Sequence, residues 1–274
     1  MGLVDGKVAI VTGAGRGIGL AVAGLMAENG ASVVVNDLDE SVADAAVAAI
    51  RDAGGKAVAC AGSVTDASFA PRLVGAALDA FGTFDIIVNN AGYTHDGLIH
   101  KMSDEQWQSM LDCHLTAPFR ILREASRHWR EWAKAEAAAG APKSRKVVNV
   151  SSTSGVAGNA GQVNYAAGKM GIVGVTKTLA KEWGRLQVNV NAVAYGFIET
   201  RLTAAKDRST KASVDGNEVE IGIPTEMRQA AIQRIPLGRP GSAREAAGPV
   251  LFLSSPLADY VTGHVVLVTG GSYM

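Results

Sequence analysis

The sequence lacks an excess of charge of either sign, because lysine and arginine together number 26 and so do aspartate and glutamate. A chain without a net positive field has nothing to attract a phosphate backbone or an anionic lipid surface. Its apolar stretches are strand-sized and interrupted by glycine, and the N-terminus has no basic segment followed by a long apolar core. These absences exclude nucleic acid and membrane as expected partners and predict a soluble, cytoplasmic protein.

Cysteine and metal-ligand patterns are also scarce. Cys60 and Cys113 lie far apart without a partner motif, so we expect two small buried hydrophobes with reduced thiols, as in a cytoplasm. Four of the histidines lack metal-ligand spacing and are expected at the surface or in packing. They are His95, His100, His128 and His264. We therefore expect no metal.

What the chain has in abundance is apolar residues, at 47%, and glycine, at 32 of 274 residues. Short β-branched runs alternate with longer alanine-rich stretches of helical spacing. Val/Ile strands separated by helices are typical of a parallel sheet buried on both faces. We expect an α/β protein with a single doubly wound Rossmann domain over residues 1–274 and a seven-stranded parallel sheet. The expected strands are residues 8–12, 32–36, 56–60, 85–89, 147–151, 188–194 and 264–269.

Two stretches interrupt this alternation. Residues 129–146 are rich in Ala, Glu and Lys, which predicts a solvated helix extension, with Trp129 and Trp132 as packing or subunit-contact residues. Residues 201–233 mix charges with glycine and proline and are too long for a simple connection. We expect them to form a substrate loop or lid.

Glycine is concentrated directly after the first expected strand, in Thr12-Gly13-Ala14-Gly15-Arg16-Gly17-Ile18-Gly19. Glycines at such a turn let the backbone approach a pyrophosphate, and the helix that follows offers free N–H groups and a positive dipole end. The spacing differs from G-x-G-x-x-G, so a purely structural turn stays an alternative when the loop is judged alone.

Asp37 ends the second expected strand, where a dinucleotide-binding fold carries the carboxylate that binds the adenosine ribose. A carboxylate there accepts both ribose hydroxyls and repels a 2′-phosphate, which favours NAD over NADP. The structural alternative is a helix N-cap, although Asp39 is better placed for that role. Arg16 favours NADP instead, because an arginine in the glycine loop can bind a 2′-phosphate.

The residues suited to acid–base chemistry follow the fifth expected strand. Ser151 and Ser152 end that strand, and Tyr165 and Lys169 follow four residues apart, on one face of a helix. A free tyrosine titrates near ~10, so a neighbouring ammonium is needed to make it a useful proton acceptor at neutral pH. We expect Lys169 to lower the pKa of Tyr165 and Ser152 to hold the substrate oxygen.

In combination these patterns resemble the short-chain dehydrogenase/reductase family over nearly the whole chain. Thr12-Gly13-x-x-x-Gly17-x-Gly19 resembles that family's cofactor loop, and Asn89-Asn90-Ala91-Gly92 its sheet-stabilising turn. Ser152, Tyr165 and Lys169 resemble its catalytic residues, and the tail Gly270-Gly271-Ser272-Tyr273-Met274 also fits. Within the family the chain is most similar to 3-oxoacyl-carrier-protein reductases and (3R)-hydroxyacyl-CoA dehydrogenases.

The resemblance implies a nicotinamide cofactor across the carboxyl ends of the strands and a homotetramer or homodimer. Ile198 and Thr200 would hold the carboxamide, and Asn90 would lie near the ribose. Together with the loop and catalytic residues, the expected cofactor site consists of Gly13, Arg16, Gly17, Ile18, Gly19, Asp37, Ser63, Val64, Asn90, Ala91, Gly92, Tyr165, Lys169, Ile198 and Thr200.

Three positions depart from the family pattern. His114 stands where the family usually has a catalytic asparagine, so it is expected either to replace that residue in the proton relay or to pack passively. Tyr195 stands where a proline is usual and could either shield the nicotinamide ring or fill the proline's space. Ser63-Val64 replaces Asp-Val beside the adenine, where a hydroxyl can still make a contact.

We therefore expect an NAD(H)-dependent oxidoreductase that interconverts a secondary alcohol and a ketone, with a 3-hydroxyacyl or 3-oxoacyl thioester as the leading substrate. A steroid or another bulky secondary alcohol is the enzymatic alternative. A binding protein that senses NAD without catalysis is the alternative from another class, since a fold alone does not establish activity.

Overall fold

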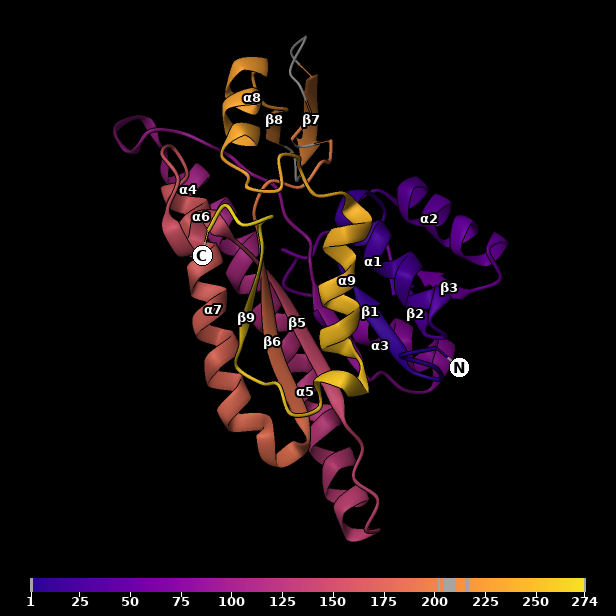
Figure 1. Ribbon diagram of the computed structural model, residues 1–274. Coiled ribbons are helices and arrows are strands. Elements are labelled where there is room, and N and C mark those ends of the chain that lie inside the picture. The colour runs from indigo at the N-terminus through magenta and orange to yellow at the C-terminus, as the bar shows by residue number, and fades with distance from the viewer. Residues whose placement is uncertain (1, 202, 205–209, 215–216, 274) are drawn as a thin grey trace.

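The computed structural model of the chain describes residues 2–201, 203–204, 210–214 and 217–273. Its main feature is a seven-stranded sheet in the order β3-β2-β1-β4-β5-β6-β9, in which every neighbouring pair is parallel (Figure 1). The predicted doubly wound sheet is confirmed, and each expected strand is present. The strands are β1 (Val8–Val11), β2 (Ser32–Val35), β3 (Lys56–Ala59), β4 (Ile86–Asn89), β5 (Arg145–Ser152), β6 (Val188–Tyr195) and β9 (Val265–Val268).

Both faces of the sheet are buried, as the apolar strands require. Alternate residues of β1 enter different clusters: Ala9 and Val11 pack with α1 and α9, whereas Val8 and Ile10 pack with α3, α5 and α7. The longer helices are α1 (Gly17–Glu28), α2 (Glu40–Asp52), α3 (Phe69–Phe81), α4 (Asp104–Leu111), α5 (Ala117–Ala138), α7 (Val163–Trp183) and α9 (Ala243–Ser254). The short α6 (Thr153–Ala157), η1 (Ile99–Lys101), η2 (Asp112–Thr116), η3 (Gly184–Leu186) and η4 (Pro256–Ala258) complete the α/β layers.

The predicted solvated helix extension is confirmed over residues 130–138, most of which are exposed at the end of α5, but it fails at the two ends of the stretch 129–146. Helix α5 ends at Ala138, and Trp129 is fully buried with its indole nitrogen donating to the carbonyl of Phe84 at 3.1 Å. Arg145 already belongs to β5 and is 2% exposed. Its guanidinium is paired with Glu136 of α5 and lies 5.3 Å from the ring centre of Trp132. Pairing with a carboxylate and an aromatic face lets this charged residue enter the core.

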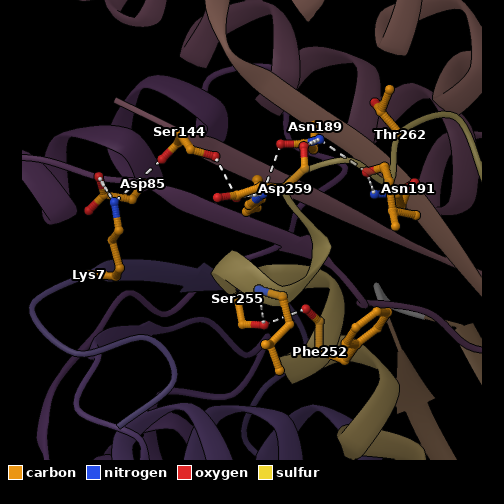
Figure 2. A network of polar contacts seen from close by, with 12 residues as sticks. Lys7, Asp85, Ser144, Asn189, Asn191, Phe252, Ser255, Asp259 and Thr262 are labelled. Carbon is orange, nitrogen blue, oxygen red and sulfur yellow. Dashed lines mark hydrogen bonds and ion pairs between the residues drawn. The ribbon is translucent and has the colours of Figure 1, made fainter. Parts of the chain in front are cut away.

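A polar network fastens the amino end of the sheet, opposite the carboxyl ends where ligands bind in such folds (Figure 2). The Lys146 ammonium donates to Asp259 at 2.5 Å and to Asn189 at 2.8 Å, and the Ser144 hydroxyl donates to Asp259 at 3.2 Å. Asn191 donates to the carbonyl of Val261 at 2.8 Å. These bonds tie the segment between η4 and β9 to β5 and β6, and so hold the edge strand in register.

Residues 201–233, predicted as a loop or lid, contain secondary structure. Strands β7 (Thr210–Val214) and β8 (Asn217–Ile221) form an antiparallel hairpin, and α8 (Thr225–Gln233) follows. Positions 202, 205–209 and 215–216 of the predicted lid lie outside the described residues. Figure 1 shows the hairpin and α8 together at the end of the molecule where α6 follows β5. Arg228 of α8 pairs with Glu199 at 2.6 Å, which connects α8 to the segment after β6.

Within the described part of the chain, no helix combines the length and the apolar character needed to cross a bilayer.

Candidate active site

The predicted cofactor loop forms a cradle that only glycine permits. Gly13 has a φ of +60°, and a Cβ there would lie 2.7 Å from the Cα of Ala91. A Cβ at Gly19 would lie 2.0 Å from the carbonyl oxygen of Gly13 and 2.5 Å from the amide nitrogen of Asn90. The start of α1 therefore approaches the loop after β4 closely, with its first N–H groups pointing to the carboxyl edge of the sheet. This arrangement fits a dinucleotide pyrophosphate.

Asn90 and Thr12 hold the two loops of the cradle together. The Asn90 side chain donates to the carbonyls of Thr12 and Gly13 at 2.9 and 3.0 Å. The Thr12 hydroxyl accepts from the backbone N–H groups of Asn90 and Ala91, both at 3.0 Å. Asn90, which was predicted to lie near a ribose, thus has a structural role at the base of the loop.

Asn36 is a site residue that the sequence reasoning missed. It is 1% exposed, accepts from the backbone N–H of Gly13 at 3.3 Å, and donates to the carbonyls of Cys60 and Gly62 at 3.0 Å. One amide thus joins the loops that follow β1, β2 and β3. A polar residue directly after an apolar strand was the available signal.

Asp37 lies beside the cradle with both carboxylate oxygens oriented by backbone. One oxygen accepts from Gly15 at 3.1 Å, and the other accepts from Asp39 at 3.4 Å. Arg16 is exposed and pairs with Asp39 at 3.1 Å. The Ser63 hydroxyl shares a hydrogen bond of 2.8 Å with Thr65 in a local turn after β3, and Val64 is half-buried next to it.

The structure brings Ser152, Tyr165 and Lys169 together at the carboxyl ends of β5 and β6. Ser152 is the last residue of β5, and its hydroxyl is near enough to the phenol of Tyr165, on the first turn of α7, to act on the pKa of that phenol. The Lys169 ammonium lies 5.5 Å from the ring centre of Tyr165 and donates to the carbonyl of Val150 at 2.8 Å. The four-residue spacing on one helix face explains this approach.

Burial, rather than the neighbouring lysine, dominates the acidity of the tyrosine. It raises the pKa of Tyr165 to about 12, although the Ser152 hydrogen bond acts in the opposite direction. Burial also lowers the pKa of Lys169 to about 8. The pKa of Tyr165 is therefore raised overall, and not lowered as expected, because both groups are desolvated and the Lys169 ammonium is bonded to a carbonyl. At neutral pH the phenol is protonated and can donate.

A second feature that the sequence did not predict is a set of hydrogen bonds beside Tyr165, between the loop after β4 and the beginning of α7. Gln162 donates to both carboxylate oxygens of Asp96, at 2.9 and 3.1 Å, and the backbone N–H of Gly97 donates to Gly161 at 2.8 Å. The buried Asn164 donates to the carbonyl of His95 at 3.0 Å. The loop after β4 is thus bonded to the residues that lead into α7, and it helps to fix the position of Tyr165.

Known proteins match the chain over most of its length. A family model described as short chain dehydrogenase matches residues 7–211. The chain belongs to the short-chain dehydrogenase family. The 3-oxoacyl-[acyl-carrier-protein] reductase FabG of Vibrio cholerae is 41% identical over 273 residues, covering 99% of both chains. The proteins of that name from Thermotoga maritima and Escherichia coli are each 36% identical and cover 98% of both chains.

Membership of the short-chain dehydrogenase family makes this protein an oxidoreductase that interconverts a secondary alcohol and a ketone with a nicotinamide cofactor. The predicted family is confirmed. The residues expected to act are those that the fold gathers at one edge of the sheet, from the loops after β1, β2 and β4, the end of β5 and the first turns of α7.

His114, at the position where short-chain dehydrogenases usually carry asparagine, is 3% exposed on the η2 turn. Its Nε2 lies 2.7 Å from the carbonyl oxygen of Tyr93, and its ring meets the Tyr165 ring edge-on at 4.9 Å. Burial and the nearby Lys169 hold the pKa of His114 well below its ordinary value. The imidazole is therefore neutral. Because a carbonyl only accepts, Nε2 carries the proton, and Nδ1 is an acceptor without a partner among the described residues.

Tyr195, where short-chain dehydrogenases usually carry proline, turns away from Tyr165 and Lys169 and toward α9. Its side chain is 6% exposed, and its hydroxyl donates to the carbonyl of Ala246 in α9 at 2.8 Å. Of the two alternatives, the structure favours packing over shielding of a nicotinamide ring. Ile198 and Thr200 follow it, and a Cβ at Gly17 would lie 3.8 Å from the Thr200 side chain.

The remaining histidines lie as packing or surface residues. The His128 ring contacts Phe84 and Trp132, whereas His100 and His264 are exposed. His95 is half-buried, and its Nδ1 has no hydrogen-bond partner among the described residues. In the described part of the chain, no three or more His, Cys, Asp or Glu side chains gather in a way that could hold a metal ion. Cys60 and Cys113 are buried and free of a disulfide.

Proposed function

We propose that this oxidoreductase interconverts a 3-hydroxyacyl and a 3-oxoacyl thioester and that it prefers NAD(H) to NADP(H). The observation that carries the reaction is the convergence of Ser152, Tyr165 and Lys169 beside a glycine cradle. The thioester is supported by the names of the relatives, which are 3-oxoacyl reductases and align with the chain from end to end.

The protonated phenol of Tyr165 is the proton donor when the ketone is reduced. A pKa of about 12 keeps the proton on the phenol at neutral pH until the substrate oxygen becomes basic. The Ser152 hydroxyl, which lies beside the phenol, is placed to donate to the same substrate oxygen. The nicotinamide cofactor supplies hydride for reduction and accepts it in oxidation, and the Gly13–Gly19 loop, Asp37 and Ile198–Thr200 would hold it.

Lys169 would support this transfer by its charge and position. Its ammonium is mostly protonated at neutral pH and lies on the same helix face as Tyr165. A positive charge there stabilises the phenolate that proton donation leaves behind. The backbone bond to Val150 fixes the ammonium at the end of β5.

His114 is proposed as a member of the path that returns a proton to this site. Its neutral ring presents an unpartnered Nδ1 lone pair in the described structure, within the interior that also holds Lys169. A lone pair there can accept a hydrogen bond from a water and so link the lysine to solvent. His114→Asn should retain turnover if this role holds, whereas His114→Phe should lose it.

The preference for NAD rests on Asp37. Backbone N–H groups orient its carboxylate at the end of β2, where it can accept ribose hydroxyls and repel a 2′-phosphate. Arg16, the residue that could favour NADP, is engaged by Asp39. Titration of the wild type and of Asp37→Ala with NADH and NADPH tests this choice, because the variant should lose its discrimination against NADPH.

The experiment that tests the whole proposal is a substrate panel with both cofactors. Acetoacetyl-CoA and longer 3-oxoacyl thioesters should be reduced with NADH, and steroid ketones should be poor substrates. Turnover of steroid or other bulky alcohols without any thioester would favour the alternative substrate class. Binding of NADH without turnover of any substrate would favour a sensing protein.

The proposal also covers the oligomeric state of the protein, the lid over its substrate and its location in the cell. Exposed Trp107, Phe119 and Met170, on α4, α5 and α7, support a homodimer or homotetramer. The hairpin and α8 are proposed as the lid over an acyl substrate, in a cytoplasmic enzyme. Light scattering at several protein concentrations measures the assembly directly, and a constant monomeric mass would contradict it.

A further inference from the structure

Tyr195 connects the end of strand β6 to helix α9. It ends β6, enters the core cluster formed with α1 and α9, and donates its hydroxyl to the carbonyl of Ala246 in the second turn of α9. The tyrosine hydroxyl thus supplies this helix with a donor from outside.

The segment directly after Tyr195 is bonded to the beginning of α9 as well. The N–H of Gly241 donates to the carbonyl of Phe197 at 3.0 Å, and the N–H of Glu199 donates back to Gly241 at 2.7 Å. A Cβ at Gly241 would lie 2.8 Å from the Ile198 side chain, so the two strands of chain approach as closely as glycine allows. Residues 195–199 are therefore attached to α9 at Ala246, by the Tyr195 hydroxyl, and just before α9 at Gly241, by backbone bonds.

Helix α9 in turn packs against α1, the helix that begins at the phosphate cradle. Ala246, Ala247 and Val250 of α9 share one core cluster with Val22 and Ala23 of α1. Arg244 and Glu28 add an exposed ion pair of 2.7 Å between the same helices. Through α9, the position of the segment after β6 is thereby set relative to the cradle.

We propose that Tyr195 is a positioning residue for the cofactor: its hydroxyl bond to α9 sets the distance between the Gly13–Gly19 cradle and the Ile198–Thr200 segment. This inference rests on the proposed nicotinamide site and adds a residue to it. Loss of the hydroxyl removes one of the two attachments of this segment to α9, while the Gly241 backbone bonds and the bonds on the adenosine side of the site, at Asp37 and Asn36, stay intact.

Tyr195→Phe tests the proposal, because it removes one oxygen and keeps the ring in the core. The affinity for NADH, measured by fluorescence titration, should fall about five-fold, the change expected for loss of one buried hydrogen bond. The affinity for ADP, which reaches only the adenosine side, should stay unchanged. In turnover the KM for NADH should rise, while kcat at saturating NADH stays within about two-fold. Tyr260→Phe is the control, because Tyr260 is fully exposed and should alter none of these values.

Three results would overturn the inference. Equal NADH affinity in Tyr195→Phe and wild type would show that the hydroxyl does not position the segment. Equal weakening of NADH and ADP would show that the variant merely loosens the domain. A wild type that binds ADP but neither NADH nor NADPH would remove the proposed function itself, and this inference with it.

Discussion

Replacing Gly19 by alanine is the sharpest perturbation of the phosphate cradle, because Gly24 provides a matched control on the same helix. A Cβ at Gly19 would lie 2.0 Å from the carbonyl oxygen of Gly13 and 2.5 Å from the Asn90 amide, whereas at Gly24 it would meet nothing within 4 Å. Both substitutions gain about 1 kcal/mol of helix propensity. Only Gly19→Ala forces backbone to move.

The size of the effect follows from that overlap. An ordinary contact begins near 3.4 Å, so the Gly13 carbonyl must retreat by more than about 1 Å from its present 2.0 Å. Overpacking of this kind costs about 1–3 kcal/mol, which exceeds the gain in propensity. The movement also breaks the Asn90 bonds that hold the loop, so NADH affinity should fall by about ten-fold or more.

Urea unfolding and NADH titration of the two variants measure both effects. Gly24→Ala should be more stable than the wild type by up to about 1 kcal/mol and should bind NADH normally. Gly19→Ala should be less stable and should bind weakly. Wild-type NADH affinity in Gly19→Ala would refute the assignment of this loop as the pyrophosphate cradle.

Three further outcomes follow from other parts of the molecule. Lys146→Met should cost about 1–3 kcal/mol in urea unfolding, because Asp259 loses its buried partner, and NADH affinity should not change; an unchanged stability would contradict the role of the network. The rate of ketone reduction should decline as pH rises through about 8, because Lys169 loses its charge, while Tyr165 with a pKa of about 12 stays protonated; a pH profile flat to pH 10 would contradict this. Asp37→Ala should bind NADPH more tightly than wild type in fluorescence titration, and an unchanged NADPH affinity would remove the basis for NAD preference.

The fold was predictable because its signals are local and repeated. The Val/Ile runs and the helices between them follow directly from side-chain periodicity, so the positions of β1 and β6 were fixed by sequence alone to within a residue or two. The closeness of Tyr165 and Lys169 was predictable for the same reason, since a four-residue spacing on a helix determines which side chains share a face.

The errors arose where a partner distant in sequence changes what a residue does. Arg145 lies inside the stretch that was predicted to be solvated, but it is buried and paired with Glu136 of α5, and no local pattern reveals that pairing. Lys169 was expected to acidify Tyr165, but burial of both groups depends on packing that no spacing reveals. The Tyr195 side chain points toward Ala246, which lies 51 residues later in the chain. A local sequence pattern could not predict that direction either.

Turnover of acetoacetyl-CoA with NADH by the wild type and by Tyr165→Phe tests the central claim most directly. The substitution removes the hydroxyl that donates the proton and leaves the cradle untouched. The wild type should reduce the thioester, and the variant should bind NADH with the same affinity while losing about a hundred-fold or more in kcat. Turnover by Tyr165→Phe at the wild-type rate would contradict the assignment of Tyr165 as the proton donor.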